Sequence, residues 1–341
     1  MRAADAFAAF RPPLSLRSGH LQSLLGSSVL RRRTVRRRAA DLCSRAEVWT
    51  LDGGDGVRLQ GLYTPQAQGS RGLAVLLHGW EGNVDSNYIL GSGARLFAAG
   101  FDVFRLNFRD HGDTHHLNPG LFHSCRLEEV VHALGDLQSR LEARNWCLAG
   151  FSLGGNFSLR VGLRAAGAGL DIGRIVAVCP VIDPARAMVS MERGMRFYER
   201  YFERKWSRSL KAKQAAFPEL YAHETWYDIK SLRARTHYLA TRHAGFASAD
   251  AYFEGYSIAG GRLARLSVPA TLLTAMDDPI VPVDDFHRLP DNPNLELIIT
   301  RYGGHCSFLK NWRFDSLAEE LIEQRFDAAS HAAPAVKAPE S

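Results

Sequence analysis

The sequence predicts an α/β protein with a mainly parallel central sheet and helices on both faces of that sheet. From residue 46 onward, short apolar runs alternate with longer amphipathic stretches, which is the pattern of strands joined by crossover helices. The apolar runs are continuous rather than alternating, as in strands buried on both faces. Hydrophobic residues make up 46% and charged residues 23% of the 341 residues, which fits a folded globular chain.

The predicted strands follow one another in a regular order. Two runs separated by the turn sequence DGGDG, at 47–51 and 57–63, predict an opening hairpin. Six buried strands are predicted after it, at 73–77, 102–108, 146–150, 174–180, 270–275 and 295–300. Between them, the 126–142 stretch predicts a helix lying on the sheet, because apolar side chains recur at the helical spacing, namely Leu127, Val130, Val131, Leu134, Leu137 and Leu141.

The order of strands and helices is interrupted once, and this divides the chain. Residues 46–183 and 263–326 form the predicted core, which ends in an amphipathic helix at about 312–326. The intervening stretch, 184–262, is rich in aromatic and basic residues and has helical periodicity, so a helical cap insertion is expected there. Residues 1–45 are interpreted as an N-terminal extension, and the Ala, Pro and Ser-rich tail at 327–341 is predicted to be disordered.

The cap carries an apolar stripe with two interpretations. Met191, Met195, Tyr198 and Phe202 fall on one face of the predicted helix. This face either packs on the core as an ordinary amphipathic helix does, or lines an apolar pocket for a chain-like ligand. Both interpretations can hold for different residues.

The positive charge is concentrated in one run. The chain has 42 basic and 36 acidic residues, a net charge of +6, and RRRTVRRR at 31–38 alone holds six arginines. The run is interpreted as a solvated basic segment, with weak peripheral contact to an anionic membrane as the alternative. Nucleic acid is not expected as a partner, because no nucleic-acid-binding motif accompanies the run.

Cysteine usage and hydropathy favour a cytoplasmic location. The five cysteines are odd in number and widely spaced, with no C-x-x-C pair that would indicate a metal or redox site. The longest apolar run, 175–182, is too short to cross a bilayer, and the N-terminus lacks the apolar segment of a secretory leader.

The central chemical signal is GFSLGG at 150–155, a G-x-S-x-G between a predicted strand and a helix-forming segment. A serine on such a sharp turn needs small neighbours two residues before and after it, which Gly150 and Gly154 supply. Ser152 is therefore the predicted nucleophile, with its hydroxyl held above the edge of the sheet.

A serine hydroxyl needs a base, and the base needs a carboxylate. His305 follows the last predicted strand in a Gly-Gly loop, which is the expected chain order for this architecture. Asp278 is the favoured acid because it follows a buried strand and carries a D-x-x-V-P continuation. Asp277 is the second candidate and Asp183 the third.

An oxyanion formed by attack of Ser152 on a carbonyl needs backbone N–H donors. The predicted donors are Leu153, directly after the nucleophile, and Trp80 in the HGWEGN loop after the strand at 73–77. The histidine-rich run at 111–123 is interpreted as a polar loop near the mouth of the site. The run contains Gly and Pro, which disfavour the helix on which hydrolytic zinc sites place their histidines, so no metal is expected.

Taken together, these motifs resemble the YheT-like group of α/β hydrolases, relatives of mammalian α/β-hydrolase-domain proteins and yeast medium-chain ethyl ester synthase/esterases. The resemblance covers about 18–326 and is carried, in order, by GHLQSLLG, LLHGWEGNVDSNYIL, NFRDHGDTHHLN, GFSLGGN, GFASADAYFEGYS, MDDPIVP and GGHCSF. It implies the α/β-hydrolase fold and a triad at Ser152, Asp278 and His305. Trp80 stands where many relatives have Leu, and Asp110 where others have Gly.

The resemblance also implies hydrolysis, or transfer to an alcohol, of short- to medium-chain acyl esters, without a cofactor. The sequence therefore predicts a serine esterase that forms an acyl-enzyme on a small-molecule ester. An acyltransferase is the nearest alternative, and product analysis with ethanol present separates the two. A non-catalytic lipid-binding protein on the same scaffold is the second alternative. The oligomeric state is left open.

Overall fold

The structure, a computed structural model, describes residues 7–332. It contains an eight-stranded sheet in the order β1-β2-β4-β3-β5-β6-β7-β8. The strands are β1 (Glu47–Asp52), β2 (Arg58–Thr64), β3 (Leu73–Leu77), β4 (Asp102–Leu106), β5 (Trp146–Phe151), β6 (Ile172–Val178), β7 (Ala270–Ala275) and β8 (Leu295–Thr300). Strand β2 pairs antiparallel with β1 and β4, and all other neighbours are parallel. The predicted fold class, including the opening hairpin, is confirmed.

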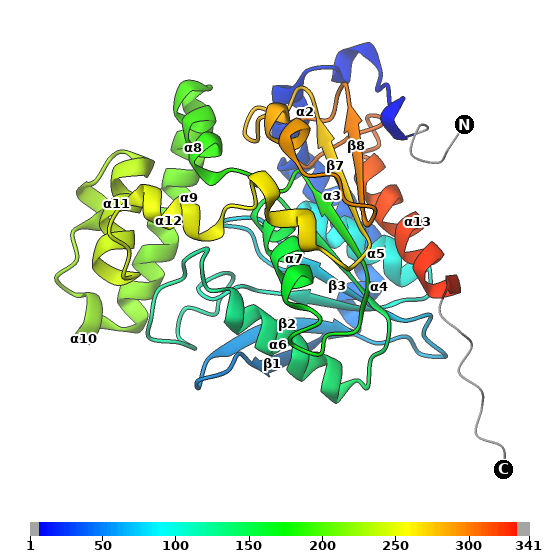
Figure 1. The fold of residues 1–341 in the computed structure, drawn as a ribbon, viewed down its shortest axis with the longest axis horizontal. Coiled ribbons are helices and arrows are strands. Elements are labelled where there is room, and N and C mark those ends of the chain that lie inside the picture. The colour runs from blue at the N-terminus through cyan, green and yellow to red at the C-terminus, as the bar shows by residue number, and fades with distance from the viewer. Residues whose placement is uncertain (1–6, 333–341) are drawn as a thin grey trace.

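Helices cover both faces of this sheet (Figure 1). Helices α6 (Leu127–Arg140) and α7 (Leu153–Arg164) lie on one face, and α5 (Asn87–Ala98) and α13 (Leu317–Ala332) lie on the other. Successive residues of β3 point to opposite faces of the sheet: Val75 packs with α6 and α7, and Leu76 packs with α5 and α13. Both side chains are fully buried, as the continuous apolar run requires.

The N-terminal segment packs closely on the core through η1 (Leu14–Leu16), α2 (Gly19–Gly26), α3 (Val29–Arg38) and α4 (Ala40–Ser44). The interpretation of 31–38 as a solvated segment is wrong for two of its residues. Arg31 is buried and pairs with Glu319 of α13 at 2.7 Å, and Val35, four residues later on the same helical face, is buried beside it. The contact of this run with an anionic membrane stays a prediction.

The C-terminal helix differs from the expected boundaries. It begins at Leu317 rather than near 312, and it continues to Ala332, so the predicted disorder of 327–332 is wrong. The sequence DAASHA extends the helix because alanine has the highest helix propensity. Residues 333–341 lie outside the described residues.

The cap consists of α8 (Pro184–Arg193), α9 (Arg196–Ala216), α10 (Pro218–Tyr221), η2 (Trp226–Asp228), α11 (Leu232–His243) and α12 (Ala249–Tyr256). In Figure 1 these helices gather on one side of the molecule, away from α13. The predicted single helical face is wrong, because α8 ends at Arg193, before Gly194, and a separate helix, α9, begins after Met195. The 3-10 helices η3 (Gly260–Arg265) and η4 (Val283–Arg288) follow the cap and β7.

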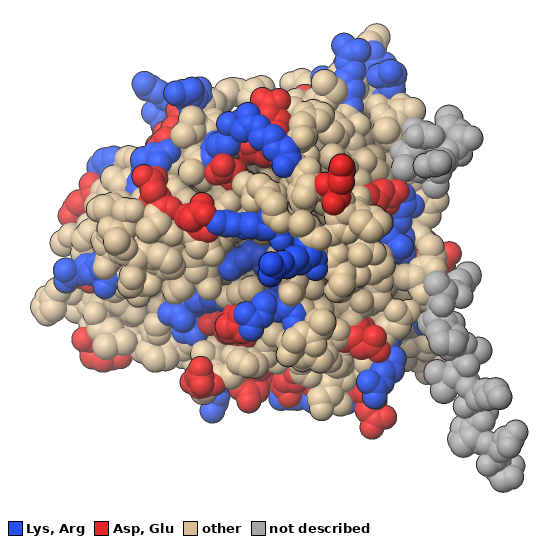
Figure 2. Space-filling model, viewed as in Figure 1, with Lys and Arg blue, Asp and Glu red and all other residues tan. Residues whose placement is uncertain are grey.

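The surface charge is mixed. Acidic and basic side chains are interspersed over the face shown in Figure 2, so the excess of basic residues does not make this face uniformly positive. Within residues 7–332, no helix combines the length and apolarity needed to cross a membrane.

Candidate active site

Ser152 occupies a sharp turn between β5 and α7, with φ of 55° and ψ of −117°. A side chain at Gly150 would place its Cβ atom 2.1 Å from the carbonyl oxygen of Gly154. A side chain at Gly154 would place its Cβ atom 2.4 Å from the carbonyl oxygens of His78 and Leu77. Only glycine fits at either position, so these two residues let the chain hold Ser152 in a strained conformation.

Asp278 and His305 form a directly bonded pair. The imidazole Nδ1 of His305 lies 2.9 Å from Oδ2 of Asp278, whose side chain is fully buried. The other carboxylate oxygen, Oδ1, accepts hydrogen bonds from the amides of Ile280 and Val281 at 2.8 and 3.0 Å. Asp278 is therefore fixed in an orientation that holds the imidazole.

The pKa of His305 reflects opposing effects. Burial lowers the pKa of the imidazole, but the Asp278 carboxylate and, to a smaller extent, Cys179 raise it, and the net result is a pKa of about 10. The ion pair thus stabilises the protonated imidazole.

The two other candidate acids have different contacts. Asp277 accepts a hydrogen bond from the amide of Gly304 at 2.9 Å, so it supports the loop that carries His305. Burial raises the pKa of Asp277, and the charge of Asp278 adds to that effect. Asp183 caps the N-terminus of α8 by accepting a hydrogen bond from the amide of Arg186 at 3.1 Å.

Ser152 and His305 line one cavity together with Cys306 and Arg32. No hydrogen bond joins Ser152 to His305 within the described part of the chain. Catalytic hydrogen bonds are often formed only in the substrate complex, so a proton transfer between these two groups would need the hydroxyl and the imidazole to approach each other.

The loop after β3 presents the amide of Trp80. The amide on one side, from Gly79, donates to the hydroxyl of Tyr88 at 3.0 Å. The amide on the other side, from Glu81, donates to Nε2 of His111 at 3.2 Å. The amide of Trp80 has no partner among residues 7–332, which leaves it free to donate to a ligand.

Leu153 is the first residue of α7, where backbone amides are not used inside the helix. Its amide also has no partner in the described part of the chain. Leu153, Trp80 and Ser152 line the same cavity. These two amides are thus available beside one cavity, and the amide of Leu153 lies at a helix end that favours negative charge.

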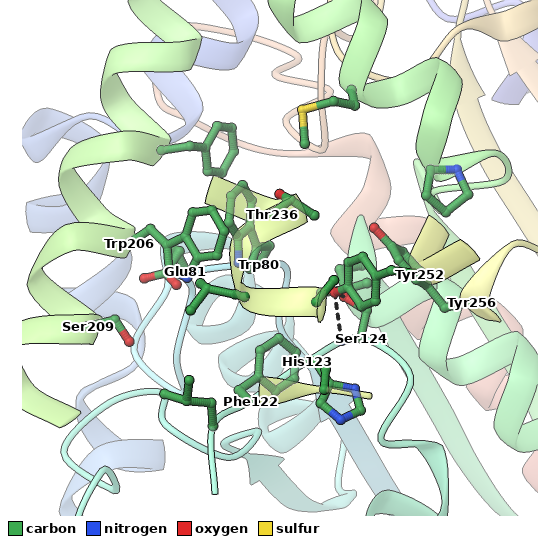
Figure 3. A pocket seen from close by; sticks show the side chains of 18 of the residues that line it. Trp80, Glu81, Phe122, His123, Ser124, Trp206, Ser209, Thr236, Tyr252 and Tyr256 are labelled. Atoms are coloured by element: carbon green, nitrogen blue, oxygen red, sulfur yellow. Dashed lines mark hydrogen bonds between the residues drawn. The ribbon is translucent and has the colours of Figure 1, made fainter. Parts of the chain in front are cut away.

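A second, mainly apolar cavity opens beside Ser152 (Figure 3). Met191 and Phe202 line it, as the pocket interpretation of the cap predicted. Met195 and Tyr198 do not line it. Met195 is 49% exposed next to the break between α8 and α9, and Tyr198 forms a hydrogen bond with Nδ1 of His20.

Several walls of this cavity were not predicted. The indole of Trp80 stacks on Phe202 with ring centroids 5.1 Å apart, and Trp206 packs edge-on against Trp80. Tyr252 and Tyr256 of α12 form the opposite wall in Figure 3. Both tyrosines lie in the motif GFASADAYFEGYS, and their aromatic side chains were the sequence signal that could have indicated a cavity wall.

The polar end of the cavity joins the cap to the core. Lys213 of α9 is buried and pairs with Asp110 at 2.7 Å, and its ammonium also donates to the carbonyl of His115. Asp110 has φ of 58°, a backbone conformation that favours glycine. The histidines of this loop do not form a cluster with metal-ligand spacing among the described residues.

The N-terminal segment holds the loop of His305, a role that sequence reasoning missed. The hydroxyl of Ser23 accepts a hydrogen bond from the amide of His305 at 2.8 Å. Gln22, which is fully buried, accepts from the amide of Leu309 at 2.7 Å and donates to the carbonyls of Leu309 and Leu16. The motif GHLQSLLG contains both polar residues, but nothing in it indicates partners near residue 305.

Comparisons with known proteins show the family of the chain. The sequence profile of the α/β hydrolase fold family matches residues 74–311, and the chain belongs to this family. It is 26% identical to slr0264 of Synechocystis, over 90% of this chain and 89% of that protein. It is 28% identical to YheT of Escherichia coli, over 76% of this chain and 77% of that protein. Both relatives carry provisional names as esterases, and the predicted resemblance to the YheT-like group is confirmed.

Among solved structures, an esterase of Pyrobaculum calidifontis matches with a TM-score of 0.55 at 17% identity, covering 94% of this chain and 99% of that chain. At this identity the likeness shows the fold. The family match and the relatives named as esterases support a hydrolase of the esterase type.

Gln22→Ala is expected to weaken the loop of His305. The substitution leaves the buried amide of Leu309 without its acceptor, so the free energy of unfolding should fall by about 1–3 kcal/mol and kcat by about tenfold. Denaturant unfolding and steady-state kinetics on a p-nitrophenyl ester measure both. Leu24→Ala, on the exposed side of the same helix, is the control. Equal effects of the two variants would contradict the positioning role.

Proposed function

We propose that this protein is a serine esterase that hydrolyses short- to medium-chain carboxylic acyl esters. The observation that carries the proposal is the convergence of Ser152, on a turn only glycines permit, with the Asp278–His305 pair and an apolar cavity. Three elements distant in sequence supply these parts at one end of the sheet, where parallel α/β folds bind ligands.

The reaction proceeds in two halves. His305 accepts the proton of Ser152 as Oγ attacks the ester carbonyl, and the amides of Trp80 and Leu153 donate to the oxyanion. Collapse of this intermediate transfers the proton from His305 to the alcohol, which leaves. Water then attacks the acyl-enzyme by the same route, releasing the acid and restoring Ser152.

The apolar cavity holds the acyl chain in this proposal. Its walls are thioether and aromatic side chains that contact a flexible alkyl chain without needing hydrogen bonds. The relatives named as esterases support the same class of substrate.

Ser152→Ala tests the nucleophile. Turnover of p-nitrophenyl butyrate should fall by at least about 10⁴-fold, and labelling by a fluorophosphonate probe should disappear, because no other group can form the acyl-enzyme. The melting temperature should stay near that of the wild type, which shows that the variant is folded. Wild-type turnover by this variant would refute the assignment.

The pH dependence tests the role of His305. The imidazole must be unprotonated to accept the serine proton, so kcat/KM should rise with pH and reach half its limit above pH 6.5, because Asp278 raises the imidazole pKa. In Asp278→Asn this midpoint should move to lower pH, and kcat should fall by about 10⁴-fold. An unchanged midpoint in the variant would exclude His305 as the titrating base.

The chain-length preference tests the cavity. Butanoyl to decanoyl esters should be preferred over acetyl esters. Met191→Trp should shift the optimum toward shorter chains because the indole fills space along the cavity wall, whereas Met195→Trp, at an exposed position outside the wall, should leave the optimum unchanged. A series of p-nitrophenyl esters measures both, and a strict preference for acetyl in the wild type would contradict the proposed substrate class.

A further inference from the structure

Two buried thiols lie beside the imidazole of His305. Cys179 follows β6, and Cys306 follows His305 directly. The Sγ atoms of both cysteines and one ring nitrogen of His305 all lie within 4.8 Å of one another. Within residues 7–332, this is the only cluster of three or more His, Cys, Asp or Glu side chains with such spacing. The esterase reaction uses neither thiol.

The backbone holds both thiols in place. Cys179 and Cys306 have φ of 45° and 64°, so each occupies a left-handed turn that directs its side chain. The amide of Cys306 donates to Sγ of Cys179 at 3.4 Å, and Sγ of Cys306 lies 3.7 Å from the carbonyl oxygen of Val178. The cluster is thus assembled before any ligand arrives.

We propose that Cys179, His305 and Cys306 form an inhibitory binding site for a thiophilic divalent cation such as Zn²⁺. Two thiolates and one imidazole form a donor set that zinc prefers over the hard cations Mg²⁺ and Ca²⁺. A tetrahedral centre with bonds of about 2.3 Å to sulfur holds its ligands about 3.8 Å apart, so side-chain shifts of about 1 Å suffice.

The surroundings of the cluster suit a cation. His305 is bonded through Nδ1 to the buried carboxylate of Asp278, the arrangement that commonly orients metal-binding histidines. Binding forms two metal–sulfur bonds and one metal–nitrogen bond. It releases both thiol protons to water, together with one imidazolium proton when His305 is protonated, with no change of oxidation state.

The cation can reach the cluster through the cavity that Ser152 and His305 share. His305 and Cys306 line this cavity together with Ser152, although Cys179 itself is fully buried. A metal bound here leaves a coordination position for water, because the cluster supplies three ligands.

Inhibition follows from the bonding of the imidazole, and this step rests on the proposed role of His305. A metal on Nε2 removes the lone pair that would accept the serine proton. A metal on Nδ1 displaces Asp278 and leaves the remaining proton on Nε2, which again cannot accept another. Either mode of binding stops acylation.

A titration with Cd²⁺ tests the site without relying on activity. The full-length protein is titrated while the sulfur-to-cadmium charge-transfer absorption is recorded, with Cys306→Ser, Cys179→Ser and Cys43→Ser in parallel. The wild type and Cys43→Ser, which lacks an exposed thiol outside the cluster, should bind one cadmium per chain. Each cluster variant should bind at least about tenfold more weakly.

Ester turnover in the presence of Zn²⁺ is the second measurement. Wild-type turnover should be lost at one equivalent of zinc and recover on addition of EDTA. At the same zinc concentration, Cys306→Ser should keep the turnover rate that it has without metal. If Cys179→Ser does not fold, the comparison of Cys306→Ser with the wild type still tests the site.

Absence of a saturable charge-transfer band in the wild type, or an equal band in Cys306→Ser, would overturn the site. A band that disappears in Cys306→Ser while wild-type turnover resists the metal would overturn the inhibitory role. A failure of the esterase proposal would be seen in a different measurement: without added metal, Ser152→Ala would still turn over the ester.

Discussion

The strained turn at Ser152 is the constraint on which the rest of the site depends. Its backbone conformation is costly for a residue with a side chain, and it persists only because Gly150 and Gly154 allow β5, α7 and the loop after β3 to approach within contact distance. The same close approach places the free amides of Trp80 and Leu153 beside the hydroxyl. One local geometry therefore supplies both the proposed nucleophile and its electrostatic partner.

The second half of the site is held from outside the central sheet. Asp278 is oriented by the amides of its own loop, whereas the loop of His305 is fixed by Ser23 and Gln22 of the N-terminal segment. That segment is in turn anchored by the buried pair between Arg31 and α13. Loss of one partner of a buried charge pair strongly destabilises a protein, because the other charge stays buried without compensation. The position of the proposed base therefore depends on the contact between the N-terminal segment and the last helix.

How much could be predicted from the sequence depended on whether the signal was local. The buried strands and the turn at Ser152 follow from continuous apolar runs and short-range glycine spacing, and the structure brings Asp278 and His305 together. The missed features depend on long-range contacts. Gln22 meets a loop nearly 290 residues away, and the break at Gly194 turns Met195 out of the cavity wall, which helical spacing alone cannot show.

The cap does more than enclose the cavity, because it contacts the loop that carries the proposed oxyanion donor. Lys205 of α9 donates to the carbonyl of Glu81 at 3.0 Å, and Phe202, one turn earlier, stacks on the indole of Trp80. The core therefore holds both residues that flank Trp80, and the cap also holds one of them, Glu81. Any displacement of α9 that opened the cavity would also disturb the Trp80 amide, so substrate enclosure and oxyanion stabilisation are coupled through this helix.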